Sequence, residues 1–368
     1  MSTITFPNRA NAQFFDDIKK NLNAYFESRG LSEKADGRMV RKTIAMLAIT
    51  FIPYGLILSN RFSPWEMLGL VVIVGIGMAG IGFSVAHDAQ HGAYSSKPWV
   101  NRTLGLWFDM MGANGYMWRV THNVIHHTYT NIHGVDEDLV VSPLLRLSPH
   151  AEYKGFQKFQ HWYAFFAYAF STLFWAFVKD YKYFFQRDLG PYKNIKHPAG
   201  EWVLLFVLKA VYYAYTIVIP WLVLDVTWWQ FVIGQLVMHF TAGFILGIVF
   251  QLAHVVEDTV QPLPDHSGNI EHSWAIHEME TTSDFARTNK FLNWYIGGLN
   301  FQIEHHLFPK VCSIHYPALS SMVEDLAKKH GIRFNQHPTM WDAVKSHYRM
   351  LKRLGNPECT EAHASQTA

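Results

Sequence analysis

Four long runs of apolar residues dominate the pattern of hydrophobic and polar positions along the chain. They cover residues 43–60, 66–86, 202–224 and 228–253. Each run approaches the roughly 20 residues that an α-helix needs to cross a bilayer. Short links join the runs into two pairs. The pattern therefore predicts an all-α membrane protein with four transmembrane helices.

The composition supports a membrane protein and argues against other classes. Hydrophobic residues make up 49% of the chain and charged residues only 16%, whereas soluble proteins average about 25% charged residues. The formal net charge is +2, which gives no reason to expect nucleic-acid binding. The two cysteines, Cys312 and Cys359, form no CxxC pair. We therefore expect reduced thiols and no disulfide framework.

The polar ends of the chain set the expected domain boundaries. Residues 1–42 show no cleavable signal peptide, and apolar positions recur at helical spacing within residues 10–30. We expect a cytosolic amphipathic segment over residues 1–42. The main domain is expected over residues 43–355, with a cytosolic helical cap on the four crossings and a flexible tail over residues 356–368.

Histidine is the unusual residue of this sequence, with 21 copies, several of them in three clusters. The clusters contain His87 and His91, then His122, His126 and His127, and finally His305 and His306. Residues four apart share one face of a helix, as in the first two clusters, and Gln302 can face the same point as the third. Imidazole suits iron, zinc, copper and nickel. Seven imidazoles exceed one tetrahedral site, so the clusters predict two metal ions.

A structural role is the alternative for histidines, which also cap helices or lie among lipid headgroups. This interpretation is reasonable for the isolated residues His133, His150, His161, His197 and His239. It fits the clusters poorly, because seven neighbouring buried imidazoles without metal would leave many donors and acceptors to satisfy.

The membrane topology follows from a parity argument. The clusters must lie on one side of the membrane to share a metal site, so the ambiguous apolar stretch 161–178 is expected to lie in the membrane plane or to be re-entrant. Basic residues crowd residues 19–42 and 179–196, while the short opposite links have almost none. The positive-inside rule then places the clusters and both termini in the cytosol.

Four stretches around the clusters carry recognisable motifs. They are residues 87–92 (HDAQHG), residues 118–131 (WRVTHNVIHHTYTN) followed by Gly134 and Asp136, residues 251–257 (QLAHVVE) and residues 300–309 (NFQIEHHLFP). In order, spacing and four-crossing layout, roughly residues 40–335 resemble the integral-membrane fatty acid desaturases.

The resemblance implies a non-haem centre of two iron ions bound by histidines. Such a centre uses dioxygen and two electrons to remove two hydrogens from an acyl chain, giving a cis double bond and water. The implied ligands are His87, His91, His122, His126, His127, His254, His305 and His306. Gln302 and Asn123 are expected to orient these ligands or to reach the metals through water. His277 is a weaker candidate ligand.

The third cluster departs from many desaturases, which have histidine where this chain has Gln302. The QxxHH form resembles the front-end desaturases, which act between an existing double bond and the carboxyl end. Many of these carry a fused cytochrome b5 domain with an His-Pro-Gly-Gly motif, which does not occur in this sequence. The chain is more similar to the shorter bacterial acyl-CoA desaturases of linoleoyl-CoA type. The position of the double bond stays open.

The resemblance also leaves the substrate and the product class open. The substrate is expected to be a fatty acyl-CoA or an acyl-lipid, and a fatty acyl hydroxylase or a sphingolipid desaturase is the alternative function. Trp118, Tyr116 and Met117 are expected to line the substrate channel, although ordinary packing explains them as well. The basic run at 179–196 either meets CoA phosphates or is a positive-inside loop.

A metal transporter and a membrane zinc hydrolase are competing classes. Transport needs polar residues along a path at mid-membrane. Within the last two apolar runs only Lys209, Gln235 and His239 are of this kind. Iron content and oxygen dependence of the purified protein would separate these classes from a desaturase.

The electron source is expected to be external. The sequence contains no haem motif and no CxxC ferredoxin pattern, and its one GxGxxG match, residues 75–80, lies inside an apolar run. We expect no bound haem or flavin, and a ferredoxin or a cytochrome b5 with its reductase as the donor. The basic residues Lys310, Lys328, Lys329 and Arg333 are the expected docking surface. A bacterial inner membrane is the expected location.

Overall fold

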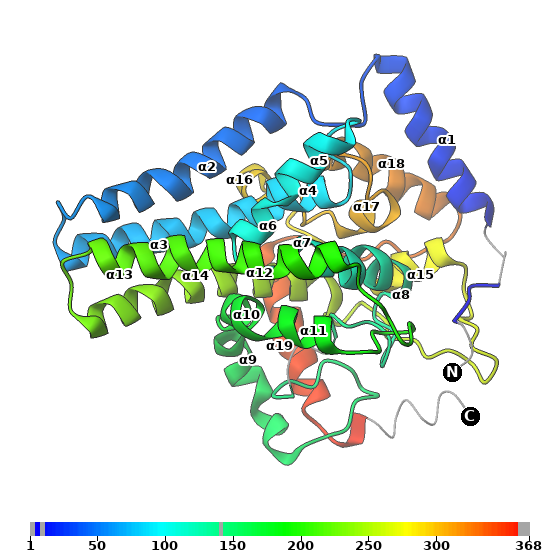
Figure 1. Ribbon diagram of the computed structural model, residues 1–368. Coiled ribbons are helices and arrows are strands. Elements are labelled where there is room, and N and C mark those ends of the chain that lie inside the picture. Colours follow the sequence, from blue (N-terminus) through cyan, green and yellow to red (C-terminus); the bar gives the residue numbers. More distant parts are fainter. Residues whose placement is uncertain (1–3, 8–11, 140–142, 360–368) are drawn as a thin grey trace.

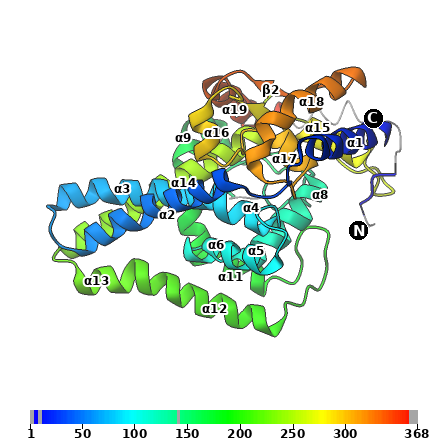
Figure 2. The same cartoon turned by 90° about the horizontal axis from the view of Figure 1, so that it is seen from above.

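The four long apolar helices extend to one side of the molecule, and shorter helices cover their other end (Figures 1 and 2). The computed structural model describes residues 4–7, 12–139 and 143–359. The helices long and apolar enough to cross a membrane are Gly37–Leu58, Pro64–Gln90, Ala199–Val223 and Trp228–His254. The predicted all-α membrane protein with four transmembrane helices is thus confirmed.

Local signals explain where the long helices begin. Asp36 caps the start of α2 (Gly37–Leu58). Ser63 and Glu66 form a capping box at α3 (Pro64–Gly80), whose first residue is a proline. The helix continues through the π-helical η1 (Ile81–Ala86) into α4 (His87–Gln90). Because the helix extends to Gln90, the first histidine cluster lies at its end, after the apolar run.

The second pair has the same construction. The third crossing comprises α12 (Ala199–Tyr213), the π-helical η5 (Ala214–Val218) and α13 (Ile219–Val223). The fourth is α14 (Trp228–His254), which begins after a capping box of Thr227 and Gln230. His254 is therefore the last residue of a crossing.

Glycines allow the membrane helices to pack closely. A Cβ atom at Gly77 would lie 2.3 Å from Thr50 Oγ1 of α2, and one at Gly75 would lie 2.7 Å from the carbonyl oxygen of Met238 in α14. Small residues at such crossings let the helix backbones approach in lipid. The helix α3 is thereby held between α2 and α14.

Between the two pairs the chain forms short helices. These are α5 (Pro98–Gly105), α6 (Trp107–Met110), α7 (Gly115–Trp118), the π-helical η2 (Arg119–His126), α8 (His127–Tyr129), the 3-10 helix η3 (Gly155–Phe159), α9 (Gln160–Tyr168), α10 (Ser171–Phe174), the π-helical η4 (Trp175–Lys179) and α11 (Asp180–Phe185). The stretch 161–178 is broken at residues 169–170. The longer piece, Ser171–Phe185, has 15 residues and spans about 22 Å, which is shorter than the roughly 30 Å hydrocarbon core.

The polar residues within the last two crossings have partners inside the protein. Lys209 Nζ lies 2.7 Å from Asp180 Oδ2 and also donates to three backbone carbonyls. Gln235 donates to the carbonyl oxygen of Thr216. His239 contacts Thr172 on α10. Lys209 and His239 thus tie the broken segment to the membrane helices, and Gln235 ties the fourth crossing to the third, which accounts for these residues without a transport path.

The C-terminal part of the chain forms most of the cap. Its elements are α15 (Trp274–Thr281), β1 (Asp284–Phe285), α16 (Lys290–Tyr295), α17 (Gln302–Leu307), the 3-10 helix η6 (Ser313–His315), α18 (Tyr316–Lys329), β2 (Gln336–His337) and α19 (Met340–Leu354). The two short strands pair in parallel. Of the expected tail at 356–368, residues 360–368 lie outside the described part of the chain.

The N-terminal amphipathic helix packs on this cap (Figure 1). The apolar face of α1 (Ala12–Arg29) presents Phe14 and Ile18 to a buried cluster that includes Leu319 and Val323 of α18. Asp17 of α1 pairs with Lys329. This contact covers a face of α18 that would otherwise be exposed.

Candidate metal centre

The eight histidines expected as ligands come from four separate parts of the fold and meet in its interior. His87 and His91 lie at the end of the second crossing, and His254 lies at the end of the fourth. The remaining residues are His122, His126 and His127 on η2 and α8, and His305 and His306 on α17. All eight side chains are buried. The structure therefore brings all of them together.

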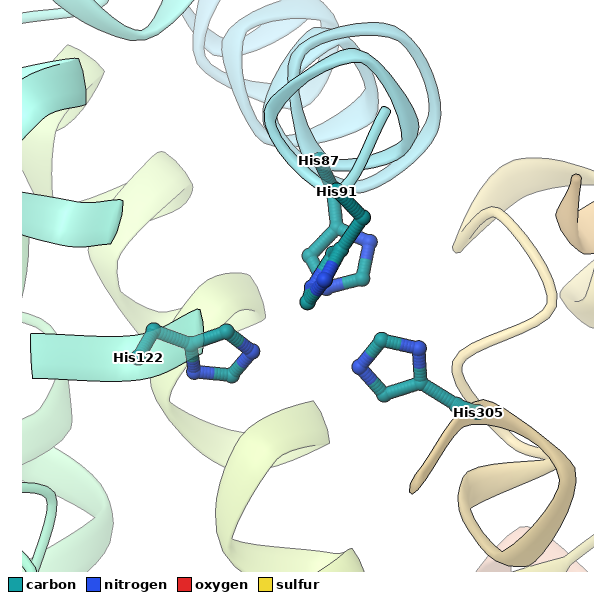
Figure 3. Close-up of side chains that lie close together, drawn as sticks. All are labelled: His87, His91, His122 and His305. Atoms are coloured by element: carbon teal, nitrogen blue, oxygen red, sulfur yellow. The ribbon is translucent and has the colours of Figure 1, made fainter. Parts of the chain in front are cut away.

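One group consists of four imidazoles from three elements. The rings of His87, His91, His122 and His305 point toward one another (Figure 3), and one nitrogen from each lies within 4.8 Å of the others. Four nitrogens at this spacing match the ligand number of one metal ion.

A second group lies beside the first. One nitrogen each of His126, His254 and His306 is within 4.8 Å of the others. His127 forms a similar group with His305 and His306, and its Nε2 lies 3.2 Å from His122 Nε2. His127 thus lies between the two groups. Two neighbouring groups of ligands are the arrangement expected for two metal ions.

The π-helix η2 and the residue after it hold the second histidine cluster. In a π-helix the hydrogen bonds connect residues five apart, and such turns are frequent at functional sites. His122 and His127 are five apart and lie in contact. His126 lies in the second group and also stacks on His122, with ring centroids 4.9 Å apart. All three histidines of this cluster therefore lie close together.

Carboxylates and a carbonyl hold the imidazoles by their Nδ1 atoms. His126 Nδ1 lies 3.0 Å from Asp136 Oδ2, and His122 Nδ1 lies 3.3 Å from Asp138 Oδ2. His254 Nδ1 is 3.3 Å from the carbonyl oxygen of Thr281. Metal-binding histidines typically donate their second ring nitrogen to such groups, which fixes the orientation of the ring.

The opposite ring nitrogens have no partner within the described part of the chain. The buried Nε2 atoms of His91, His126, His254, His305 and His306 make no hydrogen bond. Buried polar atoms are nearly always paired. Four of these five rings are anchored through Nδ1, those of His126, His254, His305 and His306. Unpaired Nε2 atoms gathered at one place fit metal ligation.

The pKa values of most of these histidines favour neutral rings, and His126 is the exception. Burial lowers the pKa of His91, His127 and His305 well below the usual histidine value, and neighbouring imidazoles add to the effect. Burial also opposes charge on His126, but Asp136 and Asp138 outweigh it and raise the pKa. Neutral imidazole is the form that binds metal.

Glu278 is the partner that the sequence analysis missed. Its Oε2 lies 2.6 Å from His306 Nδ1 and accepts a hydrogen bond from Thr130 Oγ1. Burial raises the pKa of Glu278 well above its usual range and lowers that of His306. A nearby metal cation would favour the carboxylate form. No spacing in the sequence links Glu278 to a histidine 28 residues later.

The other expected site residues divide between the centre and its surroundings. Gln302 is buried and contacts His254. Asn123 donates to the carbonyl oxygen of Gln90, while its own Oδ1 has no partner among the described residues. His277 is buried but belongs to none of the histidine groups.

Of the three expected channel residues, only Trp118 lies against the histidine groups. Its ring stacks on His122 with centroids 4.3 Å apart, and its edge meets His87 and His91. Tyr116 instead contacts His197 through its hydroxyl group. Met117 is packed in a separate apolar cluster.

Comparisons with known proteins agree with this geometry. The sequence model of the fatty acid desaturase family matches residues 63–338. The chain is 35% identical to the sn-1 linoleoyl-lipid 6-desaturase of Arthrospira platensis over 94% of both proteins. It is 36% identical to the protein of the same name from Synechocystis, covering 92% of this chain and 94% of that protein.

A plant protein shows a similar likeness. The acyl-lipid (8-3)-desaturase of Physcomitrium patens is 31% identical over 97% of this chain and 75% of its own length. The match of the family covers most of the chain, including all three histidine clusters and His254. The chain therefore belongs to the fatty acid desaturase family.

Proposed function

We propose that this membrane desaturase is a di-iron, dioxygen-dependent enzyme that introduces a cis double bond into a fatty acyl chain. The observation that supports it most is the pair of buried imidazole groups, in which most of the imidazoles have a ring nitrogen without a partner among the described residues. Imidazole ligands suit iron, and neutral rings are ready to bind it. Family membership makes acyl desaturation the reaction that fits this ligand set.

We assign the ligands to two positions. His87, His91, His122 and His305 would hold one iron ion, and His126, His254 and His306 would hold the other. His127 lies between the two, and Gln302 and Asn123 act on the ligands or through water. When bound, the iron supplies the reduction of dioxygen and the removal of hydrogen from the acyl chain.

The protein's own residues prepare this chemistry by orientation and by exclusion of water. Asp136 and Glu278 hold His126 and His306 by their Nδ1 atoms, so that the Nε2 atoms face the metals. The stacked Trp118 covers His122. All of the proposed ligands are buried, which limits the contact of the centre with bulk water.

The acyl carrier is proposed from the relatives. Their names state that two of them act on linoleoyl-lipid and one on acyl-lipid. We propose an acyl-lipid or an acyl-CoA as the substrate. Trp118 is the residue that we assign to the wall of the acyl channel, because it lies against His122. Tyr116 contacts His197 and lines a pocket that also includes His91, whereas Met117 packs in an apolar cluster.

We propose an external electron donor, either a ferredoxin or a cytochrome b5 with its reductase. The docking surface is less positive than its sequence indicates, because Lys329 pairs with Asp17 and Arg333 contacts Asp258. Lys328 and Lys310 form no ion pair within the described part of the chain, so they remain as the positive groups of this surface. Reconstitution with substrate, oxygen and NAD(P)H, with and without each carrier, measures the requirement, and raising the salt concentration tests electrostatic docking.

We also propose the cellular location and the domain limits of the protein. We place the protein in a bacterial inner membrane, with the metal centre and both termini in the cytosol. The desaturase domain covers residues 43–355, and residues 1–42 form the cytosolic segment that packs on it through α1.

Expression in a host of known lipid composition tests the function, with mass spectrometry of the extracted lipids and iron analysis of the purified protein. We expect a new double bond and about two iron ions per chain. His91→Ala, His127→Ala and His306→Ala should abolish the product and lower bound iron. His272→Ala, at a surface pair with Glu280, is the control. A hydroxylated product would instead identify a hydroxylase, and iron-free active protein would overturn the proposal.

A further inference from the structure

A pocket of about 670 Å³, lined by many polar and charged residues, lies beside the first group of histidines. Its wall is formed by parts of the chain that are far apart in sequence, including α5, the start of η2 and the start of α12. His91 is itself part of the wall. The pocket therefore reaches from the surface of the protein to the candidate metal centre.

Basic side chains outnumber acidic ones in this pocket. The basic residues are Lys34, Arg102, Arg119 and Lys310, and the acidic ones are Asp109 and Glu201. Asp109 is buried and accepts hydrogen bonds from the Asn114 amide and the Gly115 N–H. Burial raises the pKa of Asp109 to about 7, which reduces its negative charge. The pocket is thus positive.

Two of the four basic groups are held in place by the protein. Lys34 Nζ donates to the carbonyl oxygens of Gly92 and Lys310, at 3.2 and 2.8 Å. Arg119 Nη1 donates to Gln90 Oε1 at 2.6 Å. Neither contact neutralises the cation, because the acceptors are uncharged oxygens.

The other two basic groups are available to a ligand. Arg102 and Lys310 are both exposed, and within the part of the chain that the structure describes neither forms an ion pair. Polar groups of Ser95, Ser96 and Asn101 line the pocket next to them. Fixed cations at the inner wall and free cations at the rim suit a large anionic group.

We infer that this pocket binds the phosphate groups of the acyl carrier, and this inference rests on the proposed desaturase function. Arginine and lysine bind phosphate oxygens through charge-assisted hydrogen bonds. An acyl-CoA and an acyl phospholipid share this chemistry, whereas a neutral glycolipid does not have it. The contact with His91 brings the carrier end of the substrate next to the metal centre.

Binding measurements test the inference directly. Purified, iron-loaded protein in a maltoside detergent is titrated calorimetrically with coenzyme A and, separately, with short-chain phosphatidylglycerol. The double variant Arg102→Gln/Lys310→Gln should bind the phosphate-bearing probe roughly tenfold or more weakly, because charge-assisted hydrogen bonds are lost. The matched control is Arg61→Gln/Lys345→Gln, which changes one exposed arginine and one exposed lysine outside the pocket. It should bind as the unchanged protein does.

The two probes distinguish the sources of the phosphate. Binding of coenzyme A alone identifies a CoA carrier, and binding of phosphatidylglycerol alone identifies a phospholipid. The inference is overturned if neither probe binds, if the double variant retains full affinity, or if a galactolipid of the same acyl length binds the unchanged protein as tightly.

Steady-state kinetics separate this inference from the proposed function. With a phosphate-bearing substrate, Arg102→Gln alone should raise KM with kcat little changed, because Arg102 lies in the pocket, is no part of the proposed donor-docking surface, and loses contacts to the carrier and not to the reacting carbons. A lowered kcat at unchanged KM would contradict the pocket's role. If the unchanged protein binds the probes but makes no double bond from any substrate, the proposed function fails and the phosphate site stands.

Discussion

His306 Nδ1 lies 2.6 Å from Glu278 Oε2, and neither side chain is exposed to solvent. This pair joins α17 to α15 at the second group of histidines. A buried carboxylate is costly unless a positive group lies nearby. The proposed metal ion beyond His306 supplies that positive charge, so the pair and the metal stabilise each other.

Replacing Glu278 by glutamine tests this relationship. The substitution keeps the size of the side chain but removes its negative charge, and loss of such a partner typically weakens metal binding by 10–100-fold. We expect a corresponding loss of bound iron during dialysis against a chelator, measured by elemental analysis. Glu280→Gln is the matched control, since Glu280 pairs with His272 at the surface. Equal iron retention in both variants would disprove a role of Glu278 in metal binding.

A pH dependence is expected at His347 in α19. This buried ring connects three elements, because Tyr168 of α9 lies 2.8 Å from its Nε2 and its Nδ1 donates to the carbonyl oxygen of Val255. Burial lowers the pKa of His347 to about 4. The unfolded chain, with a histidine pKa of about 6.5, then binds more protons than the folded protein between these values.

The free energy of unfolding should therefore fall as the pH is lowered from about 6.5 to about 4. The full contribution of His347 is about 3 kcal/mol, present above pH 6.5 and lost below pH 4. Thermal unfolding in detergent across this range measures it. In His347→Gln the melting temperature should depend less steeply on pH. Identical pH profiles for the two proteins would rule out His347 as the titrating group.

Close packing of α2 against α3 predicts the effect of a single methyl group. A Cβ atom at Gly77 would lie 2.3 Å from Thr50 Oγ1 and 2.9 Å from its backbone. Gly77→Ala should destabilise the protein by about 1–3 kcal/mol through overpacking. Gly69→Ala in the same helix, with no atom within 4 Å of the new Cβ, is the control. Similar melting temperatures for the two variants would contradict the predicted overpacking between α2 and α3.

Cysteine labelling tests the proposed topology. In a background without Cys312 and Cys359, Lys158→Cys introduces an exposed thiol on the side of the cap, and Ser59→Cys introduces one in the link after α2. In intact cells a membrane-impermeant maleimide should label Ser59→Cys and leave Lys158→Cys unlabelled until the membrane is broken. The reverse pattern would place the metal centre outside the cytosol.

The membrane helices and the family could be predicted from the sequence. Crossing a bilayer requires a run of apolar residues of a certain length, and this property is already present in the linear chain. Capping signals such as Ser63 with Glu66 are equally local. The histidine motifs were recognisable for the same reason, because each consists of a few neighbouring residues. The observed helices and the family match confirm these predictions.

The arrangement of the histidines was decided by the tertiary structure. His126 and His306 belong to one group although 180 positions separate them in numbering, and only the packing of η2 against α17 and α14 brings them together. Glu278, Asp180 opposite Lys209 and the positive pocket beside His91 likewise depend on contacts between distant parts of the chain. Charge and hydrogen bonding act over a few ångströms in space, and only the folded chain determines which residues lie that close.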